Sequence, residues 1–166
     1  DYFEWDGTTA RVYYDAGGQR IGTRLGTGTP GYILSDNLGS TSVTLNSSQG
    51  TTAETRYKAY GEDYTSSGTQ PTTFRFTGQR LDADIQLYFY NARYYDHIVG
   101  RFVQADTIVP QAGNPQGLNM HAYTLINPAV FSDPTGRRAC ADTFDKMSYA
   151  SAYPRNVCSI IRVITG

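Results

Sequence analysis

The 166-residue chain has little of what marks helical, membrane-spanning or nucleic-acid-binding proteins. It contains no apolar run of about 18 residues, so it offers no candidate transmembrane helix. Methionine occurs only twice and stretches rich in leucine and alanine are scarce, which argues against long helices. An excess of one charge is also missing, since 14 basic and 15 acidic residues give a net charge of −1. This balance argues against nucleic acid or an anionic membrane as a partner.

Cysteine is scarce too, and Cys140 and Cys158 both lie near the C-terminus. Neither belongs to a CxxC motif or a Cys/His cluster, so the sequence predicts no metal site and no cofactor. A disulfide between them is the favoured interpretation, and two buried free thiols are the alternative. The bridge would stabilise the end of the chain by roughly 3 kcal/mol in an oxidising compartment.

Two further features concern the location of the protein. The N-terminal DYFEWDG lacks the basic and apolar regions of a signal peptide, so the chain is expected to be a portion of something longer. Asn46 begins a lone Asn-Ser-Ser triplet, which is a candidate glycosylation site and would lie at the surface of a secreted chain. We therefore expect an extracellular or cell-surface location.

What the chain does contain is a recurring pattern of strands that end in turn glycines. Gly18, Gly39, Gly61 and Gly100 each follow an aromatic or acidic turn entry, as in YYDAGGQR and YYDHIVGRF. There an aspartate or asparagine caps its own backbone, and glycine takes the positive φ that reverses the chain. Between the turns, β-branched and aromatic residues alternate with polar ones, which predicts strands. The predicted strands cover residues 11–14, 31–35, 40–46, 52–60, 72–78, 85–95 and 100–104.

These patterns predict a mainly β fold of stacked antiparallel hairpins in one domain. Residues 1–105 would form the hairpins. From 106 to 136, repeated prolines and glycines break regular structure and leave at most a short helix at 118–125. The aromatics between Leu87 and Tyr95 favour packing against a sheet, with an aromatic ligand platform as the alternative.

Residues 137–166 form a distinct C-terminal tail in this interpretation, with a helix at 141–150 and a strand at 157–164. That last strand is apolar on nearly every residue and needs cover on both faces. It could pair within the same molecule or with the next one. The candidate assembly residues are Ile160, Ile161, Val163 and Ile164.

The segment RYYDHIVGRFVQAD, residues 93–106, is preceded by FRFTGQRLDADIQLYFYNA and followed by GLNMHAYTLINPAVFSDPTG. This order of rare motifs resembles the core domain of the RHS or YD-repeat proteins, a group that includes insecticidal toxin complex C subunits and teneurin-type shells. The resemblance runs from about residue 13 to 136. It implies hairpins of the YD type, with residues 106–136 acting as a plug that seals the end of a β shell.

The resemblance also implies a candidate catalytic site. In the toxin branch of the family the core domain cuts its own chain just after a DPxG motif, by aspartyl chemistry. The matching positions here are Arg93, Asp96, Asp106 and Asp133. Of two close carboxylates, one holds a proton while the other activates water. In a purely structural interpretation, Asp96 caps its turn, Arg93 bridges to Asp106, and Asp133 begins a DPTG turn.

Two positions depart from the family pattern. Thr107 follows the aspartate of GRFVQAD where the family usually has proline, and Arg137 follows DPTG where it usually has leucine. The bond that the resemblance marks for cleavage would join Arg137 to Arg138, or lie next to it.

The sequence leaves three functions open. The first is a noncatalytic structural subunit that associates with copies of itself through open sheet edges and the terminal strand, into an assembly or fibre. The second is a self-processing core fragment that caps a longer toxin-enclosing shell, whose remainder would be its partner. The third, which follows the animal relatives, is adhesion to a surface or carbohydrate through exposed tyrosines such as Tyr88 and Tyr90.

Overall fold

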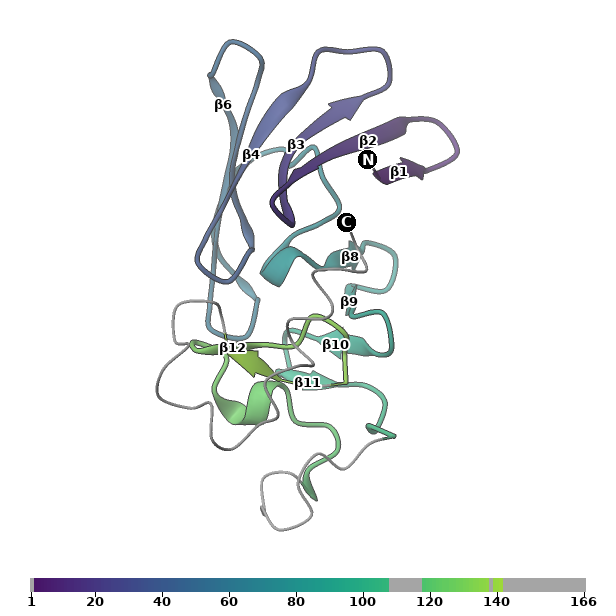
Figure 1. Ribbon diagram of the computed structural model, residues 1–166, viewed down its shortest axis with the longest axis vertical. Coiled ribbons are helices and arrows are strands. Elements are labelled where there is room, and N and C mark those ends of the chain that lie inside the picture. The colour runs from purple at the N-terminus through teal and green to yellow at the C-terminus, as the bar shows by residue number, and fades with distance from the viewer. Residues whose placement is uncertain (1, 108–117, 138, 142–166) are drawn as a thin grey trace.

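The protein is built almost wholly from antiparallel strands, as its computed structural model shows for residues 2–107, 118–137 and 139–141. A seven-stranded sheet forms one half of the molecule, and a four-stranded sheet with the connected loops forms the other (Figure 1). Among the described residues the only helical elements are short 3-10 turns. This arrangement confirms the predicted mainly β, antiparallel fold class.

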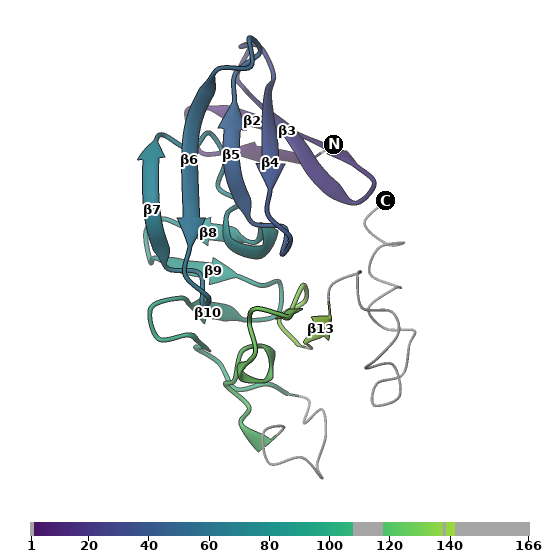
Figure 2. The same ribbon diagram turned by 90° about the vertical axis from the view of Figure 1, so that its left-hand side faces the viewer.

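The large sheet is a simple meander in which each strand pairs with the next one along the chain (Figure 2). Strands β2 and β3, and strands β5 and β6, form hairpins of the kind that the repeated turn signals predict. The seven strands are β1 (Tyr2–Trp5), β2 (Ala10–Ala16), β3 (Gln19–Leu25), β4 (Gly31–Ser35), β5 (Thr41–Leu45), β6 (Thr51–Tyr57) and β7 (Asp63–Gly68). The predicted strands did not include β1, β3 or β7, and the sequence of β7, DYTSSG, is polar with every residue exposed.

The turn glycines behave as the sequence predicts. Gly18, Gly39, Gly61 and Gly100 all adopt positive φ angles, between 73° and 93°. At Gly61 a side chain is excluded for a second reason, because an added Cβ would lie 2.5 Å from the ring of Phe76. The aspartate caps form as well: in the turn between β4 and β5 the carboxylate of Asp36 accepts hydrogen bonds from two backbone amides.

The small sheet has the order β11-β10-β9-β8, and a separate two-stranded ladder joins β12 to β13. The predicted strand at 85–95 is two strands, since Asn91 takes a φ of 58° and the chain reverses there. The prediction for 72–78 is wrong, because Thr77 and Gly78 have positive φ and form a 3-10 turn. The elements are η1 (Phe76–Gly78), β8 (Arg80–Asp82), β9 (Leu87–Phe89), β10 (Tyr94–Asp96), β11 (Arg101–Phe102), η3 (Thr124–Ile126), β12 (Phe131–Ser132) and β13 (Cys140–Ala141).

The two sheets are joined through the 3-10 turn η1. The backbone amide of Thr41, at the start of β5, donates to the carbonyl oxygen of Arg75 (3.1 Å), and the Thr41 hydroxyl donates to the carbonyl oxygen of Phe74 (2.9 Å). Phe76 then projects into the small sheet's core, where its ring packs against Tyr88 and Tyr123. This turn therefore anchors the large sheet to the half of the molecule that carries the candidate site.

The core of that half is almost entirely aromatic. Its rings meet mostly edge to face or tilted, with centroids 4.4 to 6.3 Å apart, as expected for aromatic pairs. The buried members are Phe76, Tyr88, Tyr90, Tyr95, Phe102 and Tyr123. Packing, and not an exposed ligand platform, is thus what the tyrosine-rich segment provides. Buried hydroxyls need partners, and Tyr95 donates to the carbonyl oxygen of Tyr60 (2.8 Å).

The described part of the predicted plug packs onto this core. The backbone amide of Phe102 donates to the carbonyl oxygen of His121 (3.0 Å), and Tyr123 lies inside the aromatic cluster. Only a 3-10 turn, Thr124–Ile126, forms where a short helix was expected at 118–125. The predicted helix at 141–150 and strand at 157–164, with Ile160, Ile161, Val163 and Ile164, lie outside the described residues.

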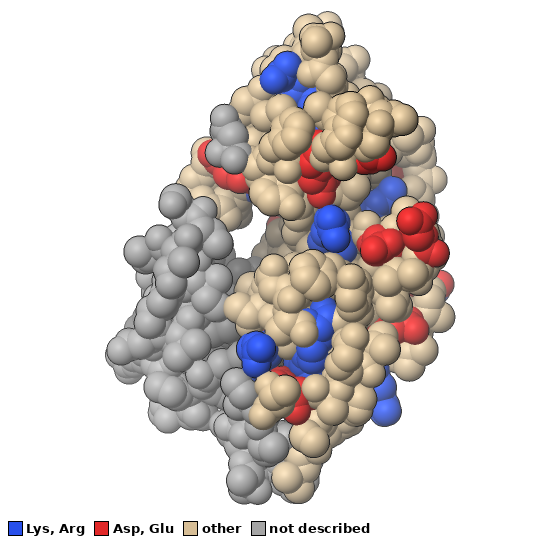
Figure 3. All heavy atoms as spheres, turned by 90° about the vertical axis from the view of Figure 1, so that its right-hand side faces the viewer, with Lys and Arg blue, Asp and Glu red and all other residues tan. Residues whose placement is uncertain are grey.

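The surface agrees with the near-zero net charge. Basic and acidic side chains are interspersed on the face shown in Figure 3, without a large field of one sign. None of the described helical turns is long and apolar enough to cross a membrane.

We expect the buried tyrosines to make the fold sensitive to alkali. Burial raises the pKa of Tyr88, Tyr90 and Tyr95 above the ordinary value, and raises the pKa of Tyr123 to about 12. Tyrosines of the unfolded chain ionise near pH ~10. The free energy of unfolding should therefore be unaffected by these groups below about pH 10 and fall above it, as the unfolded state loses protons that the folded state retains. Urea midpoints between about pH 8 and 11 measure this effect, and a flat profile would contradict it.

Candidate self-cleavage site

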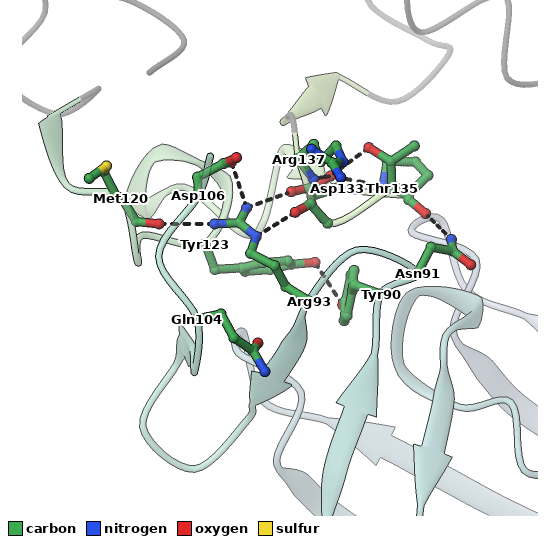
Figure 4. A network of polar contacts seen from close by, with 12 residues as sticks. Tyr90, Asn91, Arg93, Gln104, Asp106, Met120, Tyr123, Asp133, Thr135 and Arg137 are labelled. Atoms are coloured by element: carbon green, nitrogen blue, oxygen red, sulfur yellow. Dashed lines mark hydrogen bonds and ion pairs between the residues drawn. The ribbon is translucent and has the colours of Figure 1, made fainter. Parts of the chain in front are cut away.

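A buried guanidinium lies at the centre of the candidate site. The side chain of Arg93 is almost fully enclosed, and its Nη2 atom lies 3.0 Å from Oδ2 of Asp106 and 3.5 Å from Oδ2 of Asp133. Its Nη1 atom donates to the carbonyl oxygen of Met120 (2.9 Å), and its Nε atom donates to the carbonyl oxygen of Gly136. Figure 4 shows these contacts converging on one side chain. Arg93, Asp106 and Asp133 are called the Arg–Asp–Asp cluster below.

Local structure explains why Arg93 points inward. It follows the tight reversal at Asn91 and immediately precedes β10, so it shares a face with the buried Tyr95 two residues later. The flat face of its guanidinium lies over the ring of Phe102, with Cζ 3.7 Å from the ring centroid. Stacking and ion pairing together use both the plane and the edge of the guanidinium, which a lysine could not do.

The two aspartates come from different loops. Asp106 follows β11, and its backbone amide donates to the same Met120 carbonyl that accepts from Arg93 (2.8 Å). Asp133 begins the DPTG turn, where its Oδ1 atom accepts hydrogen bonds from the backbone amides of Thr135 (3.3 Å) and Arg137 (3.1 Å). Asp133 thus shapes its loop with one oxygen and contacts Arg93 with the other.

The guanidinium of Arg93 is a charged group buried away from water, and this burial affects its pKa. Burial lowers the pKa of the Arg93 guanidinium, while the negative charges of Asp106 and Asp133 raise it. The guanidinium thus contacts two buried carboxylates, and the nearby positive charge of Arg137 lowers its pKa further. Two carboxylates held on one guanidinium are an arrangement suited to acid–base chemistry.

The structure does not bring the fourth predicted catalytic residue into the cluster. The carboxylate of Asp96 accepts hydrogen bonds from the backbone amides of Ile98 (2.9 Å) and Val99 (3.0 Å), in the turn between β10 and β11. It also lies on the opposite face of β10 from Arg93, since the two are three residues apart. The turn-capping interpretation of Asp96 therefore describes its contacts.

The DPTG turn is held by hydrogen bonds that the sequence did not predict. The side-chain amide of Asn91 donates to the carbonyl oxygen of Pro134 (3.0 Å), and the backbone amide of Ala92 donates to that of Thr135 (3.2 Å). Gly136 has a φ of 69°, and an added Cβ would overlap the carbonyl oxygen of Tyr90. These partners are mostly backbone atoms, which carry no signal in a sequence.

The two positions that depart from the family pattern contact each other. Nη1 of Arg137 donates to Oγ1 of Thr107 (3.0 Å). A proline at 107 could not accept this hydrogen bond and a leucine at 137 could not donate it. The departures are therefore compatible with each other, and together they tie the loop after Asp106 to the end of the DPTG turn.

The other predicted site residues have simpler surroundings. Asn46 is exposed in the β5–β6 turn, where its side-chain oxygen accepts hydrogen bonds from the backbone amides of Ser48 (3.0 Å) and Gly50 (2.8 Å). Cys140 lies in β13, but Cys158 is outside the described residues, so their predicted disulfide stays a prediction. Within the described ranges, no three histidine, cysteine, aspartate or glutamate side chains are grouped as metal ligands would be.

Comparison with known proteins identifies the fold. The family model described as Teneurin YD-shell matches residues 2–129. The chain belongs to this family. The predicted resemblance to the RHS and YD-repeat proteins is thereby confirmed, and the two sheets are a section of a YD-shell-type structural domain.

Relatives of this YD-shell chain come from animals and bacteria. It is 34% identical over 110 residues to salivary gland surface protein 1 of Aedes aegypti, and 31% identical over 121 residues to teneurin-3 of Mus musculus. These matches cover 64% and 71% of the chain but only 3% and 4% of the relatives. The solved structure of TcdB2-TccC3-Cdc42 matches with a TM-score of 0.64 and 25% identity, over 78% of this chain and 6% of that one. The YD-shell chain therefore corresponds to a small section of much longer proteins.

We expect Arg93→Met to destabilise the YD-shell chain by about 3–5 kcal/mol, because it removes the buried guanidinium that contacts both carboxylates. Urea unfolding monitored by circular dichroism measures the loss. Arg101→Met is the matched control: Arg101 is exposed on the neighbouring strand, and its replacement should change stability by less than about 0.5 kcal/mol. Equal midpoints for the Arg93 variant and the wild type would show that the cluster carries no stability.

Proposed function

We propose that this YD-shell section cuts its own chain beside Arg137, using the Arg–Asp–Asp cluster. The single observation that supports the proposal is the convergence of Asp106 and Asp133 on one nitrogen of Arg93, whose Nε atom also holds the carbonyl oxygen of Gly136. Buried charges are costly, and such a cluster beside a peptide bond that it contacts on both sides is a reason to infer chemistry there.

The contacts assign a role to each residue. Hydrolysis adds the oxygen of water to the carbonyl carbon, breaks the carbon–nitrogen bond, and transfers a proton to the leaving nitrogen. Arg93 donates to the carbonyl oxygen of Gly136, the atom on which negative charge would develop. Oδ1 of Asp133 accepts a hydrogen bond from the nitrogen of Arg137 (3.1 Å), so Asp133 lies beside the leaving group. Once water has added to the carbonyl carbon and this nitrogen is tetrahedral, the protonated form of Asp133 would pass its proton to the nitrogen. Asp106 remains as the base that takes a proton from water.

These contacts favour the Gly136–Arg137 bond. The resemblance marks the next bond, Arg137–Arg138, and Arg138 lies outside the described residues. The masses of the two products differ by one arginine between these alternatives, so a single measurement separates them.

We expect mass spectrometry of the purified full chain to find a fragment ending at Gly136 or Arg137. Asp106→Asn and Asp133→Asn should each slow its formation by about 10²-fold or more, because a neutral amide can neither accept nor supply the proton. Asp96→Asn is the matched control and should still cleave, since Asp96 caps a turn outside the cluster. Finding only intact chain in the wild type as well as in the variants would reject self-cleavage.

A second function, assembly through open sheet edges, is favoured by the large sheet. Strands β1 and β7 are its outer strands, and within the described residues each pairs on one side only. Open edges pair readily with other strands. Phe3 and Trp5 of β1 are also largely exposed. Because the relatives are much longer, we infer that these edges adjoin further turns of a shell in a longer protein, at the cell surface or outside the cell.

We expect size-exclusion chromatography of the full chain to show association that grows with concentration. Tyr64 is exposed on β7, and Tyr64→Lys places a charge on the open edge, which should reduce association. Tyr32→Lys is the control, since Tyr32 is similarly exposed but lies on the interior strand β4. A monomer at every concentration would exclude assembly by this chain.

The adhesion hypothesis depends on exposed tyrosines, and the two tyrosines that it names are buried. Tyr88 and Tyr90 are 1% and 0% exposed, so neither ring can stack on a sugar at the surface.

A further inference from the structure

Three consecutive residues before β10 hold three consecutive carbonyl groups of the DPTG turn. The donors are the side-chain amide of Asn91, the backbone amide of Ala92 and Nε of Arg93, and their acceptors are the carbonyl oxygens of Pro134 (3.0 Å), Thr135 (3.2 Å) and Gly136, in that order. Each step along one segment matches one step along the other. The contacts together therefore fix the register of the turn against residues 91–93.

Two side chains make the contact to Pro134. Besides Asn91, the side-chain amide of Gln79 donates to the same carbonyl oxygen at 3.4 Å. The bond from Asn91 is the shorter one and has the ordinary length of an N–H···O hydrogen bond. Asn91 is exposed and lies at the reversal before β10, so its side-chain amide can be replaced without disturbing the aromatic cluster.

The backbone contact in the middle of the segment is weaker. The amide of Ala92 donates to the carbonyl oxygen of Tyr90 (2.6 Å) as well as to that of Thr135 (3.2 Å). A donor shared between two acceptors in this way binds the more distant one less strongly. The turn therefore depends on side-chain donors at Pro134 and at Gly136.

We propose that Asn91 is a positioning residue for self-cleavage. By holding the Pro134 carbonyl, it keeps the turn in the register that places the Gly136 carbonyl on Arg93. Gln79 supports it at the same oxygen. This inference rests on the proposed self-cleavage, and it assigns a role to a side chain that binds the chain two residues before the Gly136–Arg137 bond.

The geometry of the turn explains why such a distant contact would matter. Asp133 accepts a hydrogen bond from the amide of Arg137, so the proposed proton donor and the leaving nitrogen belong to one short turn. A shift of this turn along residues 91–93 would move the Gly136 carbonyl and the leaving nitrogen together, away from Arg93. Misplacing a reacting group by a fraction of an ångström is enough to slow a reaction, and binding at remote groups prevents it.

Asn91→Asp in the full chain tests the proposal. Aspartate has nearly the same shape and also tolerates the φ of 58° at this position, but its ionised carboxylate accepts hydrogen bonds and donates none. We expect cleavage near pH ~7, followed by mass spectrometry, to slow about tenfold, the effect of losing roughly one hydrogen bond. Near pH ~4 the carboxyl group gains a proton that it can donate, so the rate relative to wild type at the same pH should recover.

Two further variants serve as controls. Gln86→Glu makes the same chemical change at another exposed residue with positive φ (56°), whose side-chain amide donates to Ala83 within the β8–β9 turn (2.7 Å). It should cleave like the wild type at every pH. Asn91→Gly keeps the backbone conformation and removes the donor without adding a charge, so its cleavage should be slow at both pH values.

Hydrogen exchange supplies a measurement that does not depend on cleavage. The Arg137 amide donates to Oδ1 of Asp133, and its exchange can be followed by NMR in a background of Asp106→Asn that stays uncut. Adding Asn91→Gly should accelerate this exchange about tenfold, because the turn opens more often. Adding Gln86→Glu should leave it unchanged.

The outcomes distinguish this inference from the proposed function. Cleavage in the wild type that is equally fast in both Asn91 variants overturns the positioning role and leaves self-cleavage standing. Slow cleavage of Asn91→Asp that does not recover at low pH also overturns it, since the lost donor would not be the cause. Absence of cleavage in the wild type rejects self-cleavage. In that case an Arg137 amide that exchanges equally fast with and without the Asn91 side chain shows that Asn91 does not hold the turn either.

Discussion

The requirement to satisfy one buried guanidinium organises the lower half of this molecule. Arg93 cannot be left unpaired away from water, and the groups that satisfy it come from three separate segments: Asp106 after β11, Met120 in the following loop, and the DPTG turn. These segments have little regular structure of their own. The guanidinium therefore connects these segments to one another, and Tyr123 anchors the same loop region in the aromatic cluster.

The aromatic cluster beneath the guanidinium provides the rigid support. Tyrosine buries a large apolar ring but brings a hydroxyl that needs a partner. Here the hydroxyls solve that problem by bonding to one another and to backbone groups, as Tyr90 does with Tyr123 and Tyr95 with the Tyr60 carbonyl. A tyrosine-rich core therefore specifies both packing and polar geometry. Thr77 joins it to the large sheet, since its amide donates to Oγ of Ser40 and its hydroxyl lies 2.7 Å from that of Tyr90.

Membership of the YD-shell family gives these features a common setting. The large sheet has the open edges of a section cut from a longer shell, and the relatives are many times longer than this chain. Arg93 bridges to Asp106, and Asp133 begins the DPTG turn, which are the contacts that the purely structural interpretation describes. The structure adds one contact, between Arg93 and Asp133. That added contact brings the two carboxylates together and supports the proposed chemistry.

Local patterns in the sequence were sufficient to predict the fold class and the turn glycines, whereas the three residues that meet in the cluster were implied by the resemblance to the RHS core domain. A hairpin is encoded by neighbours in the chain, which is why Gly18, Gly39 and Asp36 could be interpreted correctly. Strand β7 was missed because its residues are polar and exposed, so its pairing with β6 leaves no apolar pattern in the sequence. The break at Thr77 was missed because its positive φ depends on partners that are distant in the sequence. The exclusion of Asp96, the Thr107–Arg137 hydrogen bond and the contact between Arg93 and Asp133 were decided only by the tertiary structure. Each of them joins atoms through space, by hydrogen bonds whose partners a linear sequence does not bring together.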